Sequence, residues 1–124
     1  MLAECKRSGI AFIPYFPLAN GLLSGKYRKG QPPPEKSRGK DAWGPSVFTD
    51  RKLDIVESLI RFASSHGHSL LELGISWLAA QETVASVIAG ATTPEQAKMN
   101  ASAAGWKLTK AELAEIDEIV LQAA

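Results

Sequence analysis

Two β-branched apolar runs, residues 10–13 and 84–90, are the segments of the chain that are typical of strands. Ile10 to Ile13 suits a strand buried on both faces, and Pro14 ends it because proline cannot donate to a sheet. The order of strand, long loop, two helices, strand and two helices predicts parallel strands with helical crossovers. Two strands do not make a stable sheet, and a whole (β/α)8 barrel needs roughly 250 residues. We therefore expect an incomplete α/β fold, part of a larger body.

Local end signals predict five helices. Gly9 is a C-terminal cap, Gly67 and Gly105 are helix stops, and capping boxes are expected at Ser69 with Glu72 and at Thr109 with Glu112. Thr93, Pro94 and Gln96 predict a cap, a first-turn proline and a capping-box partner. The expected helices are 2–8, 49–65, 69–81, 93–105 and one from 109 onward, the last with Leu113, Ile116, Ile119 and Val120 inside.

Composition narrows the class of protein. The 124 residues are 45% hydrophobic and 22% charged with net charge +1, which is globular and gives no reason to expect nucleic acid. No apolar run reaches the roughly 20 residues of a membrane span, and the first residues do not resemble a secretory signal. Cys5 is the single cysteine, which fits a reducing, cytoplasmic setting. We interpret His66 and His68 as surface turn residues, expect no metal, and interpret Trp43, Trp77 and Trp106 mainly as packing residues.

Two segments follow the strands, where parallel α/β folds carry their chemistry. The first, residues 15–26, has an aromatic ring at Tyr15 and a cation at Lys26 beyond glycines. The second, residues 90–100, enters a helix N-terminus, which favours an anion. Packing for Tyr15 and solvation for Lys26 remain alternatives, and residues 16–48, rich in proline and glycine, fit either a functional loop or a disordered hinge.

A resemblance to a known family favours the functional interpretation of these segments over the structural one. GIAFIPYFPLANGLLSGKY closely resembles the seventh-strand segment of aldo-keto reductases, and SVIAGATTPEQAKMNASAAGWKLTKAELAEID resembles their eighth strand and following helices. The likeness is weakest over residues 28–48 and is nearest to bacterial general-stress reductases and potassium-channel beta subunits. It implies the C-terminal portion of a (β/α)8 TIM barrel: residues 1–14 a helix end and strand, 15–48 a cofactor and substrate loop, 49–82 helices, and 83–124 the last strand and two helices.

The resemblance also implies roles in binding NADP, with NAD as an alternative. Tyr15 matches the ring that stacks on the nicotinamide, and Lys26 matches a lysine on the pyrophosphate. Arg38 matches, more loosely, an arginine near the adenosine phosphate. The loop around the diphosphate corresponds to Phe16, Pro17, Leu18, Ala19, Asn20 and Gly21, and the 2′-phosphate and adenine positions to Gly90, Thr92, Gln96 and Asn100.

Two departures and one absence qualify these roles. Met99 stands where the family usually has Glu or Gln, and Thr92 where many members have Arg, Lys or Ser, so the choice between NADPH and NADH stays open. In the family, hydride passes to a carbonyl that a tyrosine protonates, with lysine, aspartate and histidine in support. Those four belong to earlier strands, so we expect no catalytic residue here.

Two hypotheses follow. In the first, the chain supplies cofactor contacts and a substrate loop to a barrel whose N-terminal half comes from a preceding region, a neighbouring reading frame or a second subunit. In the second, it is a non-catalytic remnant or a partner-binding module that uses its apolar strands. The DNA upstream of Met1 discriminates between them, because the first hypothesis expects the catalytic residues to be encoded there.

Overall fold

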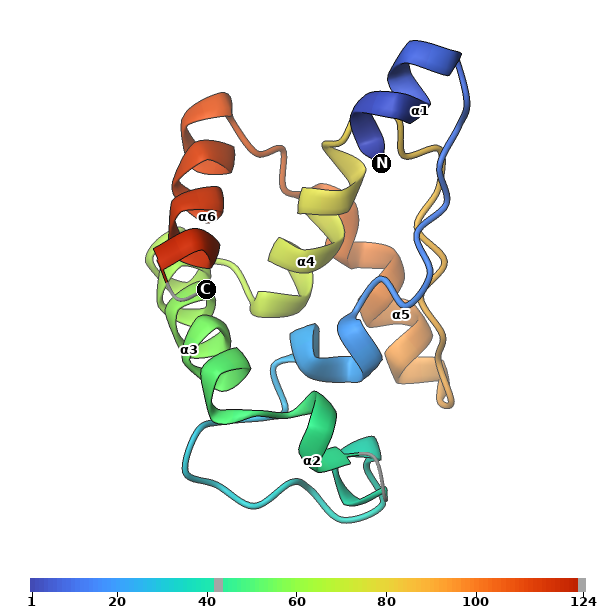
Figure 1. The fold of residues 1–124 in the computed structure, drawn as a ribbon. Coiled ribbons are helices and arrows are strands. Elements are labelled where there is room, and N and C mark those ends of the chain that lie inside the picture. The colour runs from blue at the N-terminus through green and yellow to red at the C-terminus, as the bar shows by residue number, and fades with distance from the viewer. Residues whose placement is uncertain (42–43, 123–124) are drawn as a thin grey trace.

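A computed structural model describes residues 1–41 and 44–122, and Trp43 lies outside this range. Helices dominate the described residues (Figure 1). Their bounds are α1 Leu2–Ser8, η1 Ala19–Ser24, η2 Arg38–Lys40, α2 Gly44–Val47, α3 Asp50–Ser65, α4 Leu70–Ala79, α5 Pro94–Ser102, η3 Ala103–Gly105 and α6 Lys110–Gln122, where η marks a 3-10 helix. Within the part of the chain described, no helix is both long and apolar enough to cross a bilayer.

Most helix ends are where the local signals predict them. Gly9 ends α1 in the left-handed conformation at φ 63°, a value that favours glycine. Ser69 and Glu72 form both bonds of a capping box at α4, and Thr109 and Glu112 do the same before α6. Short-range hydrogen bonds therefore define these boundaries, independently of the packing between helices.

The expected strands are wrong in extent. Among the described residues they form an isolated parallel bridge, Phe12 with Val84, in place of a ladder. Phe12 N–H donates to the Thr83 carbonyl at 2.7 Å and Ala85 N–H donates to the Phe12 carbonyl at 3.0 Å. Two paired segments without further strands give few ladder bonds and no second layer to bury both faces. The parallel direction agrees with the prediction.

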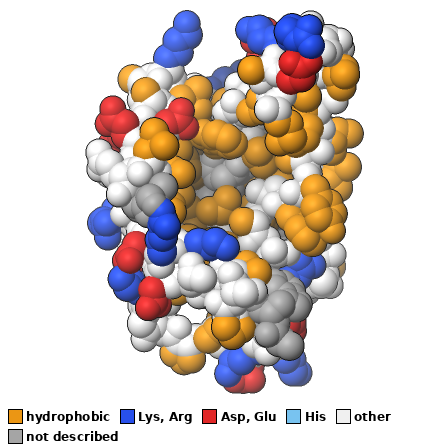
Figure 2. Space-filling view, viewed as in Figure 1, with side chains coloured by type: hydrophobic (Ala, Val, Ile, Leu, Met, Phe, Trp, Pro, Cys, Tyr) orange, Lys and Arg blue, Asp and Glu red, His pale blue; other side chains and the backbone are white. Residues whose placement is uncertain are grey.

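The faces of these extended segments are open rather than buried. Ile10, Ile13 and Ile88 are 59%, 52% and 65% exposed, against the expectation of strands covered on both faces. Figure 2 shows apolar side chains gathered on the side of this view where the two extended segments run. Burying such side chains would be favourable, so this surface is one that another body could cover.

The core lies between α3, α4 and α6. Its buried residues are Leu22, Val56, Leu59, Phe62, Ala63, Leu70, Leu73 and Ile116, drawn from these helices and from η1. Leu22 ties η1 to the core, which fixes the loop after the first extended segment. On α6 the predicted inner face is only partly right, because Ile116 is buried while Val120 is 39% exposed. Because α6 packs mainly against α3, it buries fewer apolar side chains than its sequence pattern predicts.

The long segment 15–48 is partly ordered by short helices, η1, η2 and α2. Arg28 and Lys29 secure it to α3 through ion pairs with Glu57 at 2.7 Å and Asp54 at 2.5 Å. The described part of the segment is therefore ordered and attached to α3, and its role as a functional loop stays a prediction.

Candidate functional site

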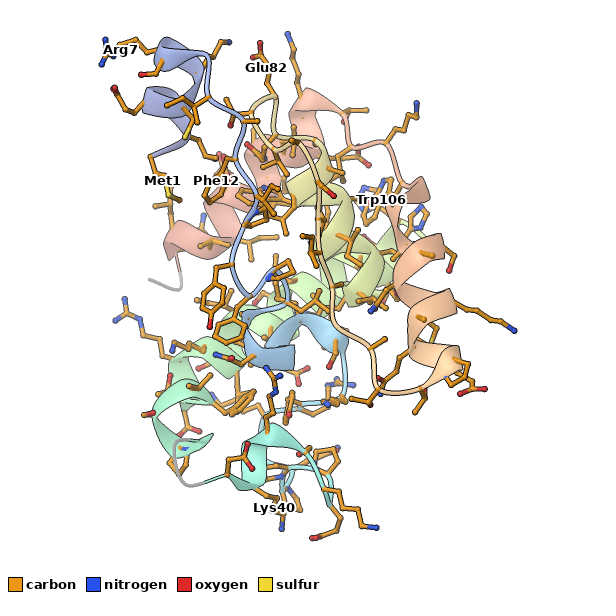
Figure 3. The ribbon with its side chains drawn as sticks, turned by 90° about the vertical axis from the view of Figure 1, so that its right-hand side faces the viewer. Met1, Arg7, Phe12, Lys40, Glu82 and Trp106 are labelled. Atoms are coloured by element: carbon orange, nitrogen blue, oxygen red, sulfur yellow. The ribbon has the colours of Figure 1, made fainter. Side chains whose placement is uncertain are left out.

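The two predicted binding segments leave the same end of the extended pair. Because Phe12 and Val84 pair in parallel, both chains continue in one direction beyond the bridge. In Figures 1 and 3, η1 and the turn before α5 both lie at the same end of α4. Both helical elements also contact α4. The structure thus brings the two segments to one end of the molecule, as the parallel order predicts.

The first segment opens with two aromatic rings. Tyr15 is 85% exposed, and its ring lies against that of Phe16 with centroids 4.0 Å apart. Phe16, Ala19 and Asn20 have φ values of 52°, 48° and 60°, a left-handed conformation that non-glycine residues rarely adopt. Such strain is often found where a loop must present its backbone to a ligand. The arrangement offers a wide exposed aromatic face to a flat ring.

Arg38 approaches this segment from η2. Its Cζ lies 5.8 Å from the centroid of the Phe16 ring, and its Nη1 donates to Asn20 Oδ1 at 3.5 Å. The loosely aligned arginine therefore lies beside two of the residues that the resemblance placed on the diphosphate loop. A guanidinium over an aromatic face keeps its donors at the edge, where they can reach a phosphate.

Lys26 and Arg38 have no ion-pair partner in residues 1–41 and 44–122, unlike their neighbours Arg28 and Lys29. The Lys26 ammonium instead lies 5.3 Å from the centroid of the Tyr27 ring. A cation held by aromatic and amide groups keeps its charge available to an anion. This pair of available cations at one end of the fold is the electrostatic feature that fits a diphosphate.

Leu18 and Ala19 are predicted loop residues whose side chains pack against buried clusters of the fold. Leu18 lies against the buried cluster of Leu71, Ile75 and Ala103, on the α4 side of the loop. Pro17 before it is half-buried. Leu18 can therefore offer a ligand mainly its backbone, while its side chain anchors the loop.

The second segment already uses several of its own hydrogen-bond donors. Thr92 donates to Gln96 Oε1 from its N–H at 2.8 Å and from its hydroxyl at 3.0 Å. Gln96 N–H donates to Thr93 Oγ1 at 3.2 Å, and Asn100 Nδ2 donates to the Gly90 carbonyl at 3.3 Å. The capping box predicted at Thr93 is thus only half formed, since the Gln96 side chain reaches Thr92 instead.

This second segment fits an anion less readily than the first. Glu95 adds a negative charge to the first turn of α5. A phosphate would have to displace Gln96 from Thr92 before it could use those donors. The carbonyl and hydroxyl groups present suit neutral contacts to a sugar or a base better than they suit a phosphate, because a carbonyl oxygen cannot donate a hydrogen bond.

His66 lies in an exposed turn after α3, as predicted, and His68 is half-buried in the link before α4. His68 stacks on Trp106 with centroids 4.2 Å apart, and His66 lies 4.5 Å from the Phe62 ring. His68 also contacts the Glu72 carboxylate. The pKa of Glu72 is lowered mainly by hydrogen bonds from the Ser69 backbone and hydroxyl, and further by the contact with His68. Over residues 1–41 and 44–122 no three metal-binding side chains come together. The histidines join α3, α4 and the segment before α6.

Tyr27 lies near the site and matches none of the binding positions predicted from the sequence. It is 3% exposed, among the least accessible side chains of the loop. Its position in GLLSGKY, next to Lys26, is the signal that could have identified it.

Comparison with known proteins agrees with the resemblance seen in the sequence. The aldo/keto reductase family matches residues 1–121 of the chain. An L-glyceraldehyde 3-phosphate reductase of Escherichia coli O157:H7 is 35% identical over 95% of this chain and 36% of its own length. A probable voltage-gated potassium channel subunit beta of Oryza sativa is 36% identical over 77% of this chain and 30% of its own length.

The backbone fold has a solved counterpart as well. A glycerol dehydrogenase of Gluconobacter oxydans matches with a TM-score of 0.79 and 22% identity, over 100% of this chain and 38% of that one. The chain therefore spans 30% to 38% of the length of these three proteins, which agrees with the partial barrel expected from the sequence. By the match over residues 1–121, this chain belongs to the aldo/keto reductase family.

Proposed function

We propose that this chain supplies the dinucleotide-binding part of an NAD(P)H-dependent aldo-keto reductase, which reduces a carbonyl to an alcohol. The observation that carries the proposal is the pair of available cations, Lys26 and Arg38, beside the exposed rings of Tyr15 and Phe16. Aromatic faces and phosphate-binding cations at the carboxyl ends of parallel segments are what a nicotinamide dinucleotide requires.

Each group has a distinct role in the proposal. Tyr15 stacks on the nicotinamide ring, which when bound supplies the hydride. Lys26 neutralises the diphosphate, and Arg38 lies near the adenosine phosphate. The loop residues Phe16, Pro17, Leu18, Asn20 and Gly21 surround the diphosphate, and Gly90, Thr92, Gln96 and Asn100 contact the adenosine end.

The proton transfer is expected to come from outside these segments. In the family, the catalytic residues are a tyrosine, a lysine, an aspartate and a histidine, which belong to earlier strands. The proposal therefore requires the N-terminal half of the barrel to supply these residues, and a small carbonyl compound as substrate. We expect the 124-residue chain alone to show no carbonyl-dependent NADPH oxidation. Turnover above a blank by the purified chain would contradict this expectation.

Titration of the purified chain with NADPH and NADH tests the binding role directly. Nucleotide fluorescence and calorimetry should both report saturable binding that weakens with added salt, because phosphate contacts are electrostatic. The ratio of the two affinities measures the cofactor preference that Thr92 and Met99 leave open. Absence of saturable binding of either nucleotide would contradict the proposal.

A non-catalytic, partner-binding role is the second candidate, and one observation favours it. Ile10, Ile13 and Ile88 expose apolar side chains on the extended segments. In that case the surface would serve an unrelated protein rather than the rest of a barrel. Dinucleotide binding would then be weak or absent, and upstream DNA without catalytic residues would support this candidate.

A further inference from the structure

Tyr27 connects the two cations of the proposed site although its own side chain is buried. Its ring lies against that of Phe48 in a tilted arrangement, with centroids 4.2 Å apart and planes inclined by 31°. The next two residues are held on α3 by Glu57 and Asp54. The contacts with Phe48 and α3 therefore fix one side of the tyrosine. The Lys26 side chain lies over its ring.

The ring edges of Tyr27 touch the elements that carry the predicted binding residues. A Cβ placed on Gly21 of η1 would lie 3.6 Å from Tyr27 Cε2, which is ordinary contact. A Cβ on Gly39 of η2 would lie 2.8 Å from Tyr27 Cε1, which is too close for a side chain. Glycine at position 39 thus lets η2 approach the ring, and with it Arg38, the residue just before.

Different parts of Tyr27 act on the two cations. The hydroxyl oxygen accepts the Gly39 N–H at 3.3 Å, one peptide away from Arg38. The ring face lies under the Lys26 ammonium, 5.3 Å from its centroid. Loss of the hydroxyl alone should loosen the segment of Arg38 and leave the cation–ring contact of Lys26 in place.

We infer that Tyr27 is a positioning residue for the dinucleotide, which presets the spacing between Lys26 and Arg38. Long basic side chains lose rotamer freedom on binding, and a scaffold that orders them beforehand reduces that cost. The inference rests on the proposed function, because it concerns how the same site holds the same ligand.

A double-mutant cycle tests it. The affinity for NADPH and for NADH is measured by calorimetry for wild type, Tyr27→Phe, Arg38→Ala, Lys26→Ala and the two double variants. Tyr27→Phe should weaken binding about three- to tenfold, the scale of one hydrogen bond. The loss should fall below about twofold when Arg38 is already alanine and persist when Lys26 is alanine, since only coupled residues are non-additive. Equal losses in both backgrounds, or no loss in the wild-type background, would overturn the inference.

A ligand-free measurement excludes general destabilisation as the cause. Amide hydrogen exchange should accelerate at Gly39 in Tyr27→Phe and remain unchanged at Leu59 in the core. Lys52→Ala is the control, because it removes a lysine charge at an exposed position of α3, and it should bind the dinucleotide as wild type does. Unchanged exchange at Gly39 would also overturn the inference. If wild type binds neither dinucleotide, the proposed function and this inference both fail; if it binds and Tyr27→Phe binds equally well, the inference alone fails.

Discussion

Arg28 forms a bidentate ion pair with Glu57, in which Nε donates to Oε1 at 2.7 Å and Nη2 donates to Oε2 at 2.8 Å. The two residues are 29 positions apart, so the contact fastens the loop after η1 to the middle of α3. This hydrogen-bonded guanidinium is the main reason that the pKa of Glu57 falls from 4.5 to about 2. The Lys29 backbone N–H adds a third bond to the same carboxylate.

The ion pair between Arg28 and Glu57 predicts that the stability of the fold depends on pH. In the folded chain Glu57 stays charged down to about pH 2, while in the unfolded chain it gains its proton near pH 4.5. The unfolded state binds more protons in this interval, so the stabilisation is complete above it and is lost as pH falls towards 2. Glu57→Gln should lower the free energy of unfolding at pH 7 by about 1 kcal/mol, a value discounted for solvent screening, and should flatten its slope between pH 2 and 4.5.

Urea unfolding at a series of pH values measures this effect. Glu115→Gln, at an exposed position of α6, is the control. An identical slope for Glu57→Gln and wild type would show that the pair does not stabilise the fold.

Lys26→Ala should weaken NADPH binding by about 1–3 kcal/mol, the scale of a charge-assisted contact. Lys52→Ala removes an exposed lysine of α3 instead, and it should leave the affinity near the wild-type value. The salt dependence of binding should decrease for the first variant only. Calorimetry at two ionic strengths measures both quantities, and equal affinities for Lys26→Ala and wild type would refute the assigned role.

Ser69→Ala should destabilise the fold by about 1 kcal/mol, because the hydroxyl caps α4 by accepting the Glu72 N–H at 3.2 Å. Ser64→Ala, at an exposed position near the end of α3, should stay within about 0.5 kcal/mol of wild type. Thermal and urea unfolding of the two variants give the comparison. Similar midpoints for both would show that the cap contributes little.

Phe62→Ala should cost about 3–5 kcal/mol, as for other buried aromatic residues. Phe62 is 5% exposed and meets the His66 and Trp106 rings with centroids 4.5 and 6.0 Å away. Its loss should therefore also release the segment before α6, which near-ultraviolet circular dichroism of Trp106 reports. A cost below about 1 kcal/mol would mean that the aromatic cluster is not well packed.

Ile13→Lys should reduce self-association of the chain. Ile13 is 52% exposed on an extended segment whose edge bonding is limited to one bridge, and a charge at such an edge discourages pairing with other chains. Sedimentation velocity of the variant should show more monomer than wild type, with Lys52→Ala, at an exposed position on α3, as a surface control. A wild-type chain that is already monomeric with a cooperative melt would contradict the expectation.

Signals only a few residues long already specify most helix boundaries. Gly9, Ser69 with Glu72 and Thr109 with Glu112 act through bonds that span three or four positions, so they form wherever the local backbone is helical. The family and the two candidate binding segments also follow from the sequence, because GLLSGKY and the stretch from Ser86 are contiguous motifs.

Other properties depend on packing between residues far apart in the chain. Lys26, Arg28 and Lys29 look alike in the sequence, yet the latter two are neutralised by α3 and Lys26 is not, in the part of the chain described. The same packing buries Tyr27 and leaves Ile10 and Ile13 open. Sequence patterns report what a segment could bury, whereas the partners that arrive from other elements determine which charges are neutralised and which faces are covered.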